Sequence, residues 1–173
     1  LKKVGDYRNM EVVVAPSTIA LQSLSLQTDR RKIKLAAQNA FYHDYGAFTG
    51  EVSFTQLKGI ADYAIVGHSE RRYLLAENDK MIQKKVAAAV RNHITPILCI
   101  GETESERAFG ETKDVIRDQL IGGLSEIADD DIEKVMIAYE PVWAIGTGKT
   151  ATSEDANNTI KEIRKEIEKI YGK

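Results

Sequence analysis

The chain has 173 residues and a net charge of −2, with 24 basic and 26 acidic residues. This length is enough for one domain with a substantial core, and the balanced, scattered charge favours neither nucleic acid nor an anionic membrane as a partner. No apolar run approaches the roughly 20 residues of a membrane span, and the first residues lack the apolar segment of a signal peptide. The single cysteine, Cys99, excludes an intrachain disulfide and fits a reducing compartment. We therefore expect a soluble, cytoplasmic, globular domain over residues 1–173.

Short β-rich runs alternate along the chain with longer amphipathic segments, which is typical of βα units on a parallel sheet. We expect strands at residues 11–15, 33–37, 63–66, 95–100 and 135–139. A helix capped by Ser17 should follow the first strand, and a short helix near 54–60 should follow a polar, aromatic loop over 38–50. Three further helices are expected. The first has Asn78 or Asp79 as its N-cap, the second covers 112–121 and ends at Gly122-Gly123, and the third covers 153–171 and ends at Gly172.

The number of units suggests an incomplete barrel. Five βα units in 173 residues give about 35 residues per unit, whereas a complete eight-unit (β/α) barrel takes roughly 250 residues. We therefore expect about five parallel strands with helices on the outer face. Such a sheet has two open edges, which predicts self-association as a dimer or larger assembly.

One long motif, residues 138–152, follows the fifth expected strand and reads Ala-Tyr-Glu-Pro-Val-Trp-Ala-Ile-Gly-Thr-Gly-Lys-Thr-Ala-Thr. It places a carboxylate, Glu140, at the end of a strand, followed by a proline hinge and a glycine-containing tip. A carboxylate under a loop that can close over it is the layout of a lidded general base. The alternative is a strand-end glutamate in an ordinary surface salt bridge.

A second motif, Gly-His-Ser-Glu-Arg-Arg at residues 67–72, follows the third strand. Ser69 can cap a short helix beginning at Glu70, whose free N–H groups would keep the imidazole of His68 neutral. A neutral imidazole can donate a hydrogen bond to a substrate oxygen, although a lone histidine is often a buried structural residue. His43 and His93 match no catalytic motif and are interpreted as surface or packing residues.

Together, the two motifs resemble the triosephosphate isomerase family, and the resemblance runs through nearly all of the chain. It covers the family's βα units two to six and implies a truncated TIM (β/α) barrel. The family's first strand, with its asparagine and catalytic lysine, and its last two phosphate-binding strands have no counterpart in the 173 residues. Lys2 and Lys3 follow no strand and do not match the family's Asn-x-Lys setting.

The resemblance implies interconversion of dihydroxyacetone phosphate and glyceraldehyde 3-phosphate, without a metal or an organic cofactor. Glu140 would take a proton from the carbon beside the carbonyl and His68 would act on the carbonyl oxygen, a pairing for which this family is itself the standard example. Glu70 would belong to the same catalytic group. Because its lysine partner has no counterpart here, Glu70 must find another partner, face water or be protonated.

The resemblance also assigns supporting roles around the lid. Gly146 would bring a backbone N–H to the substrate phosphate, since glycine permits a close approach. Glu102 would brace the first lid hinge, which is formed by Pro141, Val142 and Trp143, while the second hinge would be residues 149–151. Closure of this loop over the substrate is the family's standard gating motion.

Residues 46–51 resemble the long loop that enters the neighbouring subunit in family dimers. Phe48 would supply apolar area, and the hydroxyl of Thr49 would reach the site of the partner. The alternative is a solvent-exposed loop with one buried aromatic side chain. Cys99 either belongs to the family's pattern at the end of the fourth strand or only packs in the core.

Two broader alternatives accompany these assignments. Gly148-Lys149-Thr150 matches the end of a nucleotide-binding P-loop, but that motif needs a glycine where Trp143 stands. Two hypotheses about function remain, an enzyme and a structural module. The first is a triosephosphate isomerase chain that is impaired or inactive in this truncated form, and the second is a non-catalytic, self-associating partial-barrel module.

Overall fold

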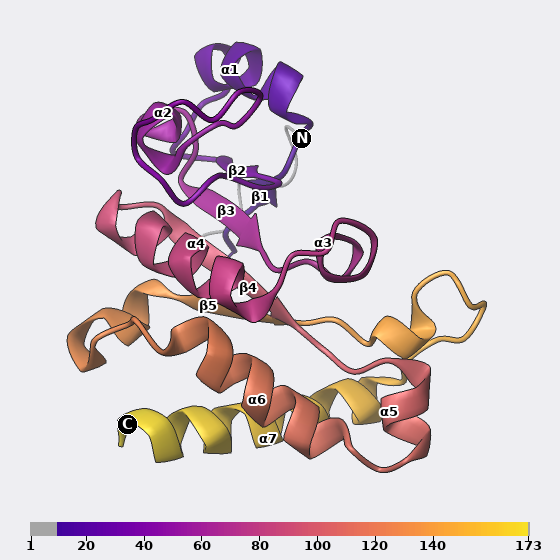
Figure 1. Ribbon diagram of the computed structural model, residues 1–173. Helices are drawn as coiled ribbons and strands as arrows, with labels where there is room; N and C mark the ends of the chain where they lie inside the picture. The colour runs from indigo at the N-terminus through magenta and orange to yellow at the C-terminus, as the bar shows by residue number, and fades with distance from the viewer. Residues whose placement is uncertain (1–9, 173) are drawn as a thin grey trace.

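The computed structural model describes residues 10–172, so Lys2 and Lys3 lie outside the described residues (Figure 1). Strands and helices alternate along the chain in the predicted manner. The elements are β1 (Val13–Val14), α1 (Thr18–Gln27), β2 (Lys34–Ala37), α2 (Phe54–Leu57), β3 (Tyr63–Val66), α3 (Ser69–Leu74), α4 (Asp79–Arg91), β4 (Thr95–Ile100), α5 (Glu104–Ala108), α6 (Thr112–Leu124), η1 (Asp129–Lys134), β5 (Met136–Tyr139), η2 (Val142–Ala144) and α7 (Ser153–Tyr171).

The five strands form one curled parallel sheet whose spatial order, β1-β2-β3-β4-β5, is the order of the chain (Figure 1). The pairings on both sides of β4 are the most extensive, with Tyr63 opposite Thr95 at the start of the β3–β4 pairing and Ile97 opposite Met136 at the start of the β4–β5 pairing. Within the described residues, β1 and β5 each pair on one side only. The predicted truncated (β/α) barrel with two open edges is therefore confirmed.

The apolar core lies between the sheet and the helices that cover its outer face. Alternate residues of each strand point to this face, and those of β3 and β4 are fully or almost fully buried there: Ala64, Val66, Leu98 and Ile100. They pack with buried residues of α4 and α6, including Ile82, Val86, Ile116 and Leu120. This packing fixes the strands, and with them the loops at their carboxyl ends.

The boundaries of several elements differ from the expected ones. β1 is limited to Val13 and Val14, and α2 ends at Leu57 rather than near residue 60. The helix expected to stop at Gly122-Gly123 continues to Leu124, so that prediction was wrong. A Cβ at Gly123 would lie 2.8 Å from Leu98 Cδ2, which indicates that glycine here lets α6 approach β4 closely rather than ending the helix. The short elements α5, η1 and η2 were not predicted.

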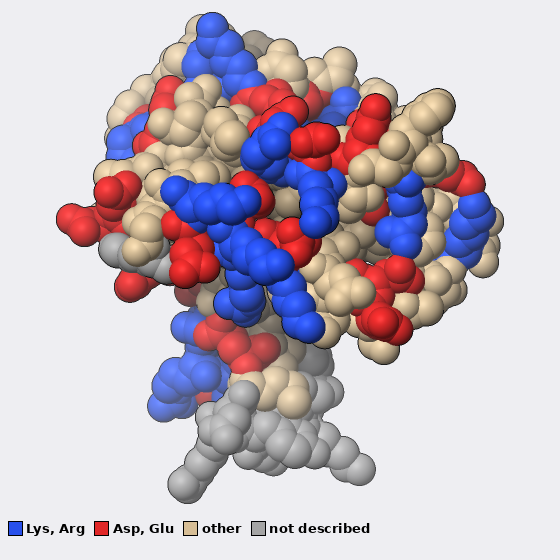
Figure 2. Space-filling view, turned by 90° about the horizontal axis from the view of Figure 1, so that it is seen from below, with Lys and Arg blue, Asp and Glu red and all other residues tan. Residues whose placement is uncertain are grey.

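Charged side chains of both signs are mixed over the face seen from below (Figure 2). Within α7, Lys165 pairs with Glu162 and Lys169 pairs with Glu166. Neither sign of charge dominates the face drawn in Figure 2. None of the helices in residues 10–172 combines the length and apolar character needed to cross a bilayer.

Candidate active site

The carboxyl ends of β3, β4 and β5 bring the main candidate residues to one edge of the sheet. His68 follows β3 after Gly67, Glu102 follows β4 after Gly101, and Glu140 directly follows β5. Because parallel strands all end at the same edge, residues more than 70 positions apart in the chain can meet there. His68 and Glu140 do so, with 2.8 Å between His68 Nε2 and Glu140 Oε1.

His68, and not Ser69, is the N-cap of α3, so the predicted cap was wrong by one residue. The imidazole Nδ1 of His68 accepts a hydrogen bond from the backbone N–H of Glu70 at 3.3 Å. An imidazole nitrogen that accepts a hydrogen bond carries no proton, which leaves the proton of the neutral ring on Nε2. His68 Nε2 can therefore donate a hydrogen bond, and it lies toward the carboxylate of Glu140.

Glu140 is largely buried and is held by three donors. Besides the contact with His68, its Oε2 accepts the backbone N–H of Ser69 at 3.0 Å, and its Oε1 lies 3.5 Å from the Ser69 hydroxyl. Ser69, the first residue of α3, is thus free to bind Glu140 because it does not serve as the cap. The surface salt bridge considered from the sequence is excluded, since the side chain of Glu140 is only 13% exposed and its partner is His68.

Two residues of the β4 end pack against Glu140. A Cβ on Gly101 would lie 1.7 Å from the backbone oxygen of Glu140, so only glycine allows the two segments to come this close. The thiol of Cys99 is free and 4% exposed. Burial, with a further contribution from the Glu140 carboxylate, raises the pKa of Cys99 to about 12, so this thiol is protonated at neutral pH.

The first lid hinge is anchored around Glu102, which is completely buried. The backbone oxygen of Glu102 accepts the N–H of Trp143 at 3.3 Å, and its carboxylate accepts the hydroxyl of Tyr139 at 3.1 Å. Arg107 from α5 reaches the same carboxylate at 3.3 Å and lies 4.3 Å from the centre of the Trp143 ring. The contact that the resemblance implied between Glu102 and this hinge is therefore present.

The rest of the hinge and the lid tip are more exposed. Pro141 and Val142 are half-buried, whereas residues 145–150 are exposed. Gly146 has a φ of +71°, a left-handed conformation that favours glycine, and no atom lies within 4 Å of where a Cβ would be. The loop around Gly146, which the resemblance assigns to the lid, is therefore exposed to solvent.

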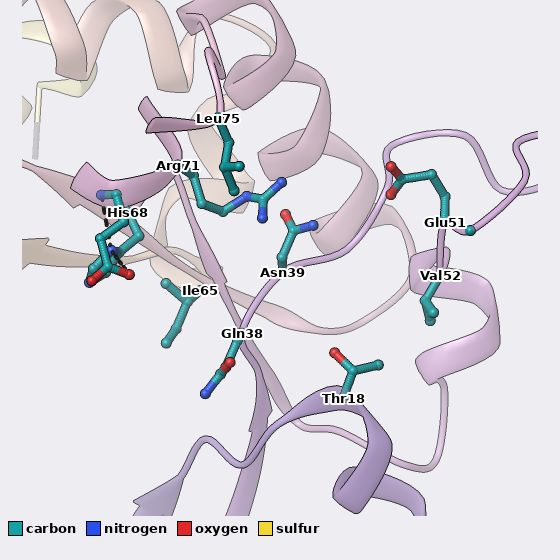
Figure 3. Close-up of a pocket in the computed structure, with 11 residues that line it drawn as sticks. Thr18, Gln38, Asn39, Glu51, Val52, Ile65, His68, Arg71 and Leu75 are labelled. Atoms are coloured by element: carbon teal, nitrogen blue, oxygen red, sulfur yellow. Dashed lines mark hydrogen bonds and ion pairs between the residues drawn. The ribbon is translucent and has the colours of Figure 1, made fainter. Parts of the chain in front are cut away.

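A pocket of about 500 Å³ adjoins His68 on the β2 side of the site (Figure 3). The floor is Ile65, and the guanidinium group of Arg71 and the amide group of Asn39 point toward each other across one wall. Glu70 also lines this pocket, with its side chain 69% exposed and its Oε2 atom 3.8 Å from His68 Nδ1. Of the three outcomes expected for Glu70, the structure shows the second, a carboxylate that faces solvent.

A buried ion pair supports the wall of this pocket. Lys85 of α4 donates to Glu77 Oε2 at 2.6 Å and to Asn39 Oδ1 at 2.7 Å, and Arg71 donates to the same Glu77 oxygen at 2.7 Å. Burial alone would raise the pKa of Glu77, but the hydrogen bonds from Lys85 and Arg71 outweigh it and hold that pKa below its usual range. Sequence reasoning missed this network, because no motif links residues from four separate segments.

The loop over residues 38–50 carries Phe48 and Thr49 near its end. Phe48 is 40% exposed, and its ring stacks on His43 with 4.8 Å between centroids and also contacts Phe41. Residues 46–51 are exposed to solvent, as the alternative expected, but the aromatic side chain of Phe48 is not buried. Thr49 is exposed, so its hydroxyl is available to another molecule.

Comparison with known proteins gives a consistent result. A sequence model of the family described as "Triosephosphate isomerase" matches residues 1–173. The chain belongs to the triosephosphate isomerase family. It is 48% identical to the triosephosphate isomerase of Clostridium tetani over 94% of its own length, and 49% identical to that of Clostridium acetobutylicum over 100%. It spans 64% of the first of these relatives and 70% of the second.

The site thus contains the two central groups of the family motif in direct contact. Sequence reasoning missed three further participants: Ser69 as a ligand of Glu140, and Tyr139 and Arg107 as partners of Glu102. Ser69 lies inside the recognised motif and could have been found there, whereas Arg107 lies on a short helix that the sequence did not predict. Residues 10–172 contain no group of three or more His, Cys, Asp or Glu side chains placed to hold a metal ion.

Proposed function

We propose that the site around Glu140 and His68 interconverts dihydroxyacetone phosphate and glyceraldehyde 3-phosphate by proton transfer. The observation that carries this proposal is the 2.8 Å separation between a carboxylate oxygen and a proton-bearing imidazole nitrogen, beneath an open lid. Such a pair offers a base for a carbon-bound proton and a hydrogen-bond donor for the adjacent oxygen. Membership of the triosephosphate isomerase family supports the same reaction.

The substrate would take the place of the direct contact between the two side chains. Glu140 would remove a proton from the carbon beside the carbonyl, and the electron pair of that C–H bond would form the enediolate double bond. His68 Nε2 would donate its hydrogen bond to the oxygen on which negative charge develops. Return of the proton from Glu140 to the neighbouring carbon, with transfer of the hydroxyl proton between the two oxygens, completes the isomerisation.

Closure of the lid would complete this site. Gly146 would place its N–H against the substrate phosphate, and the covered site would exclude the water that competes for the enediolate. Pro141, Val142 and Trp143 would act as the hinge because Trp143 is fixed against Glu102 while the tip is exposed. Glu70 would contribute its charge from the rim of the pocket next to His68.

We expect the 173-residue polypeptide by itself to be a very poor isomerase. It supplies the base, the imidazole and the lid, but no counterpart of the family's lysine or of the last two phosphate-binding strands. Loss of one preorganised group that stabilises transition-state charge commonly costs about 2.7–4 kcal/mol, or a hundred- to thousandfold in rate. Missing phosphate contacts would lower the rate further, because remote binding energy also stabilises the transition state.

The test is the progress curve of isomerisation, combined with NMR detection of solvent deuterium entering dihydroxyacetone phosphate. We expect slow incorporation that Glu140→Gln abolishes and His68→Asn reduces. Glu168→Gln, the same change at an exposed site on α7, serves as the matched control and should have no effect. Turnover within tenfold of a complete family enzyme would contradict the expected impairment. Incorporation that persists in Glu140→Gln would refute the assignment of the base.

The alternative, a non-catalytic partial-barrel module, would instead give no incorporation above the level of Glu140→Gln. The comparisons do not favour it, because the matched relatives bear the name of the enzyme across nearly all of this chain. We further propose a cytoplasmic location, which agrees with the single buried thiol.

We also propose that the chain self-associates as a dimer or larger assembly, with the loop carrying Phe48 and Thr49 at the interface. Two observations support this. Phe48 exposes apolar surface at a loop end, and the pocket beside His68 combines apolar Ile65 and Val52 with the polar groups of Arg71 and Asn39. A loop end that carries an aromatic ring and a hydroxyl group can fill a pocket that is lined by both apolar and polar side chains.

A further inference from the structure

The exposed part of the lid has one polar attachment to the body of the protein. Within residues 145–151, the hydroxyl of Thr147 donates to the backbone oxygen of Trp143 and accepts the N–H of Lys149, so both contacts stay inside the lid. Among the hydrogen bonds and ion pairs of the described chain, only that between Lys149 Nζ and Glu104 Oε1 joins this segment to a residue outside the lid.

Glu104 is well placed to act as a fixed anchor. It is the first residue of α5, and that helix is held by a capping box in which Thr103 and Glu106 satisfy each other's backbone groups. Arg107 of the same helix packs on Trp143 and binds both Glu102 and Asp155. The α5 helix therefore touches the buried hinge through Arg107 and the exposed part of the lid through Glu104.

The position of this ion pair opposes closure. Figure 1 shows the lid extending outward from the carboxyl end of β5, beside α5. A closed lid needs Gly146 over the His68–Glu140 pair, and Lys149 lies only three residues beyond Gly146. When the tip moves toward the strand ends, the backbone must bend at the hinge that begins with Lys149, which turns this side chain away from its open position, whereas Glu104 stays in α5.

We propose that Glu104 and Lys149 form a latch that holds the lid open and is released on closure. Glu104 is then a positioning residue: it touches no reacting atom but sets how often the lid leaves its open position. The inference rests on the proposed function only in naming what the lid covers. Both side chains are more than half exposed, so the pair should be weak and sensitive to salt, as a latch that opens in every catalytic cycle must be.

Hydrogen–deuterium exchange of the amides of residues 145–151, measured by mass spectrometry without substrate, tests the latch. Glu104→Gln removes the charge but leaves the capping box of α5 intact, and it should raise the exchange rate about two- to fivefold, the range expected for one exposed ion pair. Salt at roughly 0.5 M should raise the rate in the wild type to the same level and leave Glu104→Gln unchanged.

Three further variants make the test specific. Asp131→Asn removes a comparable exposed partner, that of Lys134 in η1, and should leave exchange in the lid unchanged. Glu104→Lys should raise the rate further, and the charge swap Glu104→Lys with Lys149→Glu should return it toward the wild type. Equal exchange in the wild type and Glu104→Gln at low salt, or no recovery in the swap, would overturn the proposal. Because this experiment does not measure turnover, the latch can be refuted without refuting the proposed isomerase reaction, and the reverse is also true.

Discussion

The side chains of Glu140 and His68 are in direct contact, and this contact bears on how a ligand could bind between them. Both carboxylate oxygens of Glu140 accept hydrogen bonds, from His68 and Ser69. In the proposed reaction, a substrate that binds between Glu140 and His68 would have to separate the two side chains. The backbone N–H of Ser69 does not depend on that contact and would still hold Glu140 in place, which would limit the entropy lost when the reactive geometry forms.

The buried thiol of Cys99 leads to a prediction about reactivity. Because its pKa is raised to about 12, we expect iodoacetamide to leave the folded protein unmodified at pH 8 and to label it in urea. Cys99 is the only cysteine, so the mass of the intact protein reports the reaction without ambiguity. The folded thiol keeps its proton where the unfolded thiol would lose it, so stability should also fall as the pH rises above about 9. Rapid labelling in buffer alone would show that the β4 end is not packed as described.

The ion pair between Glu77 and Lys85 predicts strong coupling between two substitutions. Glu77→Gln leaves the buried ammonium group of Lys85 without a counter-charge and should cost about 3–5 kcal/mol of unfolding free energy. We expect the double variant Glu77→Gln with Lys85→Met to cost at least about 1 kcal/mol less than the sum of the two single changes. Urea unfolding at pH 7 measures all four members of this cycle. Additive effects would show that the pair contributes no specific interaction.

The same pair sets a pH dependence. The folded pKa of Glu77 lies below its usual value, so the stability that its charge supplies is present above the unfolded pKa of about 4.3. That stability is lost as the pH falls through the lower folded pKa. The gap in unfolding free energy between the wild type and Glu77→Gln should therefore narrow below about pH 4. A gap that stays constant from pH 7 to pH 3 would contradict this assignment.

At the scale of elements, the approach of β4 to β5 depends on Gly101. We expect Gly101→Ala to lower the unfolding free energy by about 3 kcal/mol, the upper part of the range for overpacking, because its Cβ would lie 1.7 Å from the backbone oxygen of Glu140. Gly122→Ala is the control, since its Cβ would meet only the side chain of Asp79 at 3.2 Å and alanine favours the helix. Chemical denaturation compares the two variants. Equal stabilities would show that the segments can separate without cost.

Strand order and helix positions could be predicted from the sequence because each buried strand of a parallel sheet is a continuous apolar run. Boundaries were less accurate where tertiary contacts decide them. Gly122 and Gly123 look like a helix end, yet α6 continues through both, and at Gly123 a Cβ would lie only 2.8 Å from Leu98 Cδ2. Similarly, α5 is only five residues long and carries no apolar periodicity, so its existence depends on a capping box and on contacts with the lid.

Within the site, the sequence predicted the chemical groups but not their arrangement. His68 and Glu140 stand out because each follows a strand in a long, specific motif. Their mutual contact, and the role of Ser69 in it, depend on where α3 begins, and the competition between His68 and Ser69 for the cap could not be resolved from residue preferences alone. Glu77, Lys85 and Asn39 come together only when the sheet has formed.

At the scale of the whole molecule, the open sheet predicts assembly. Met136 of β5 is 45% exposed, and the rest of that strand is only half-buried, so an apolar strand with unpaired backbone groups lies at the surface. We expect light scattering at micromolar concentration to show a dimer or larger species. The interface should bury an open edge or the mouth of the barrel, alongside the loop that carries Phe48 and Thr49.

Two substitutions distinguish these surfaces. Phe48→Ser removes the exposed ring of the loop, and Met136→Lys places a charge on the β5 edge, so each should shift the population toward smaller species if its surface is buried. Ile19→Ser, on α1, changes an equally apolar and 94% exposed residue as a comparison. A monodisperse, cooperatively melting monomer in the unmodified chain would refute the assembly.

The agreement between strand order in the sheet and strand order in the chain has a kinetic consequence. Every strand pairs with the one made just before it, so no pairing has to wait for a distant segment. The chain segments between successive strands have similar, moderate lengths. They can close one after another, so the loss of chain entropy is divided over several steps. A polypeptide leaving the ribosome could therefore add one strand after another to a growing sheet. The contact between Glu140 and His68 would form last, when β5 brings Glu140 to a histidine that is already in place.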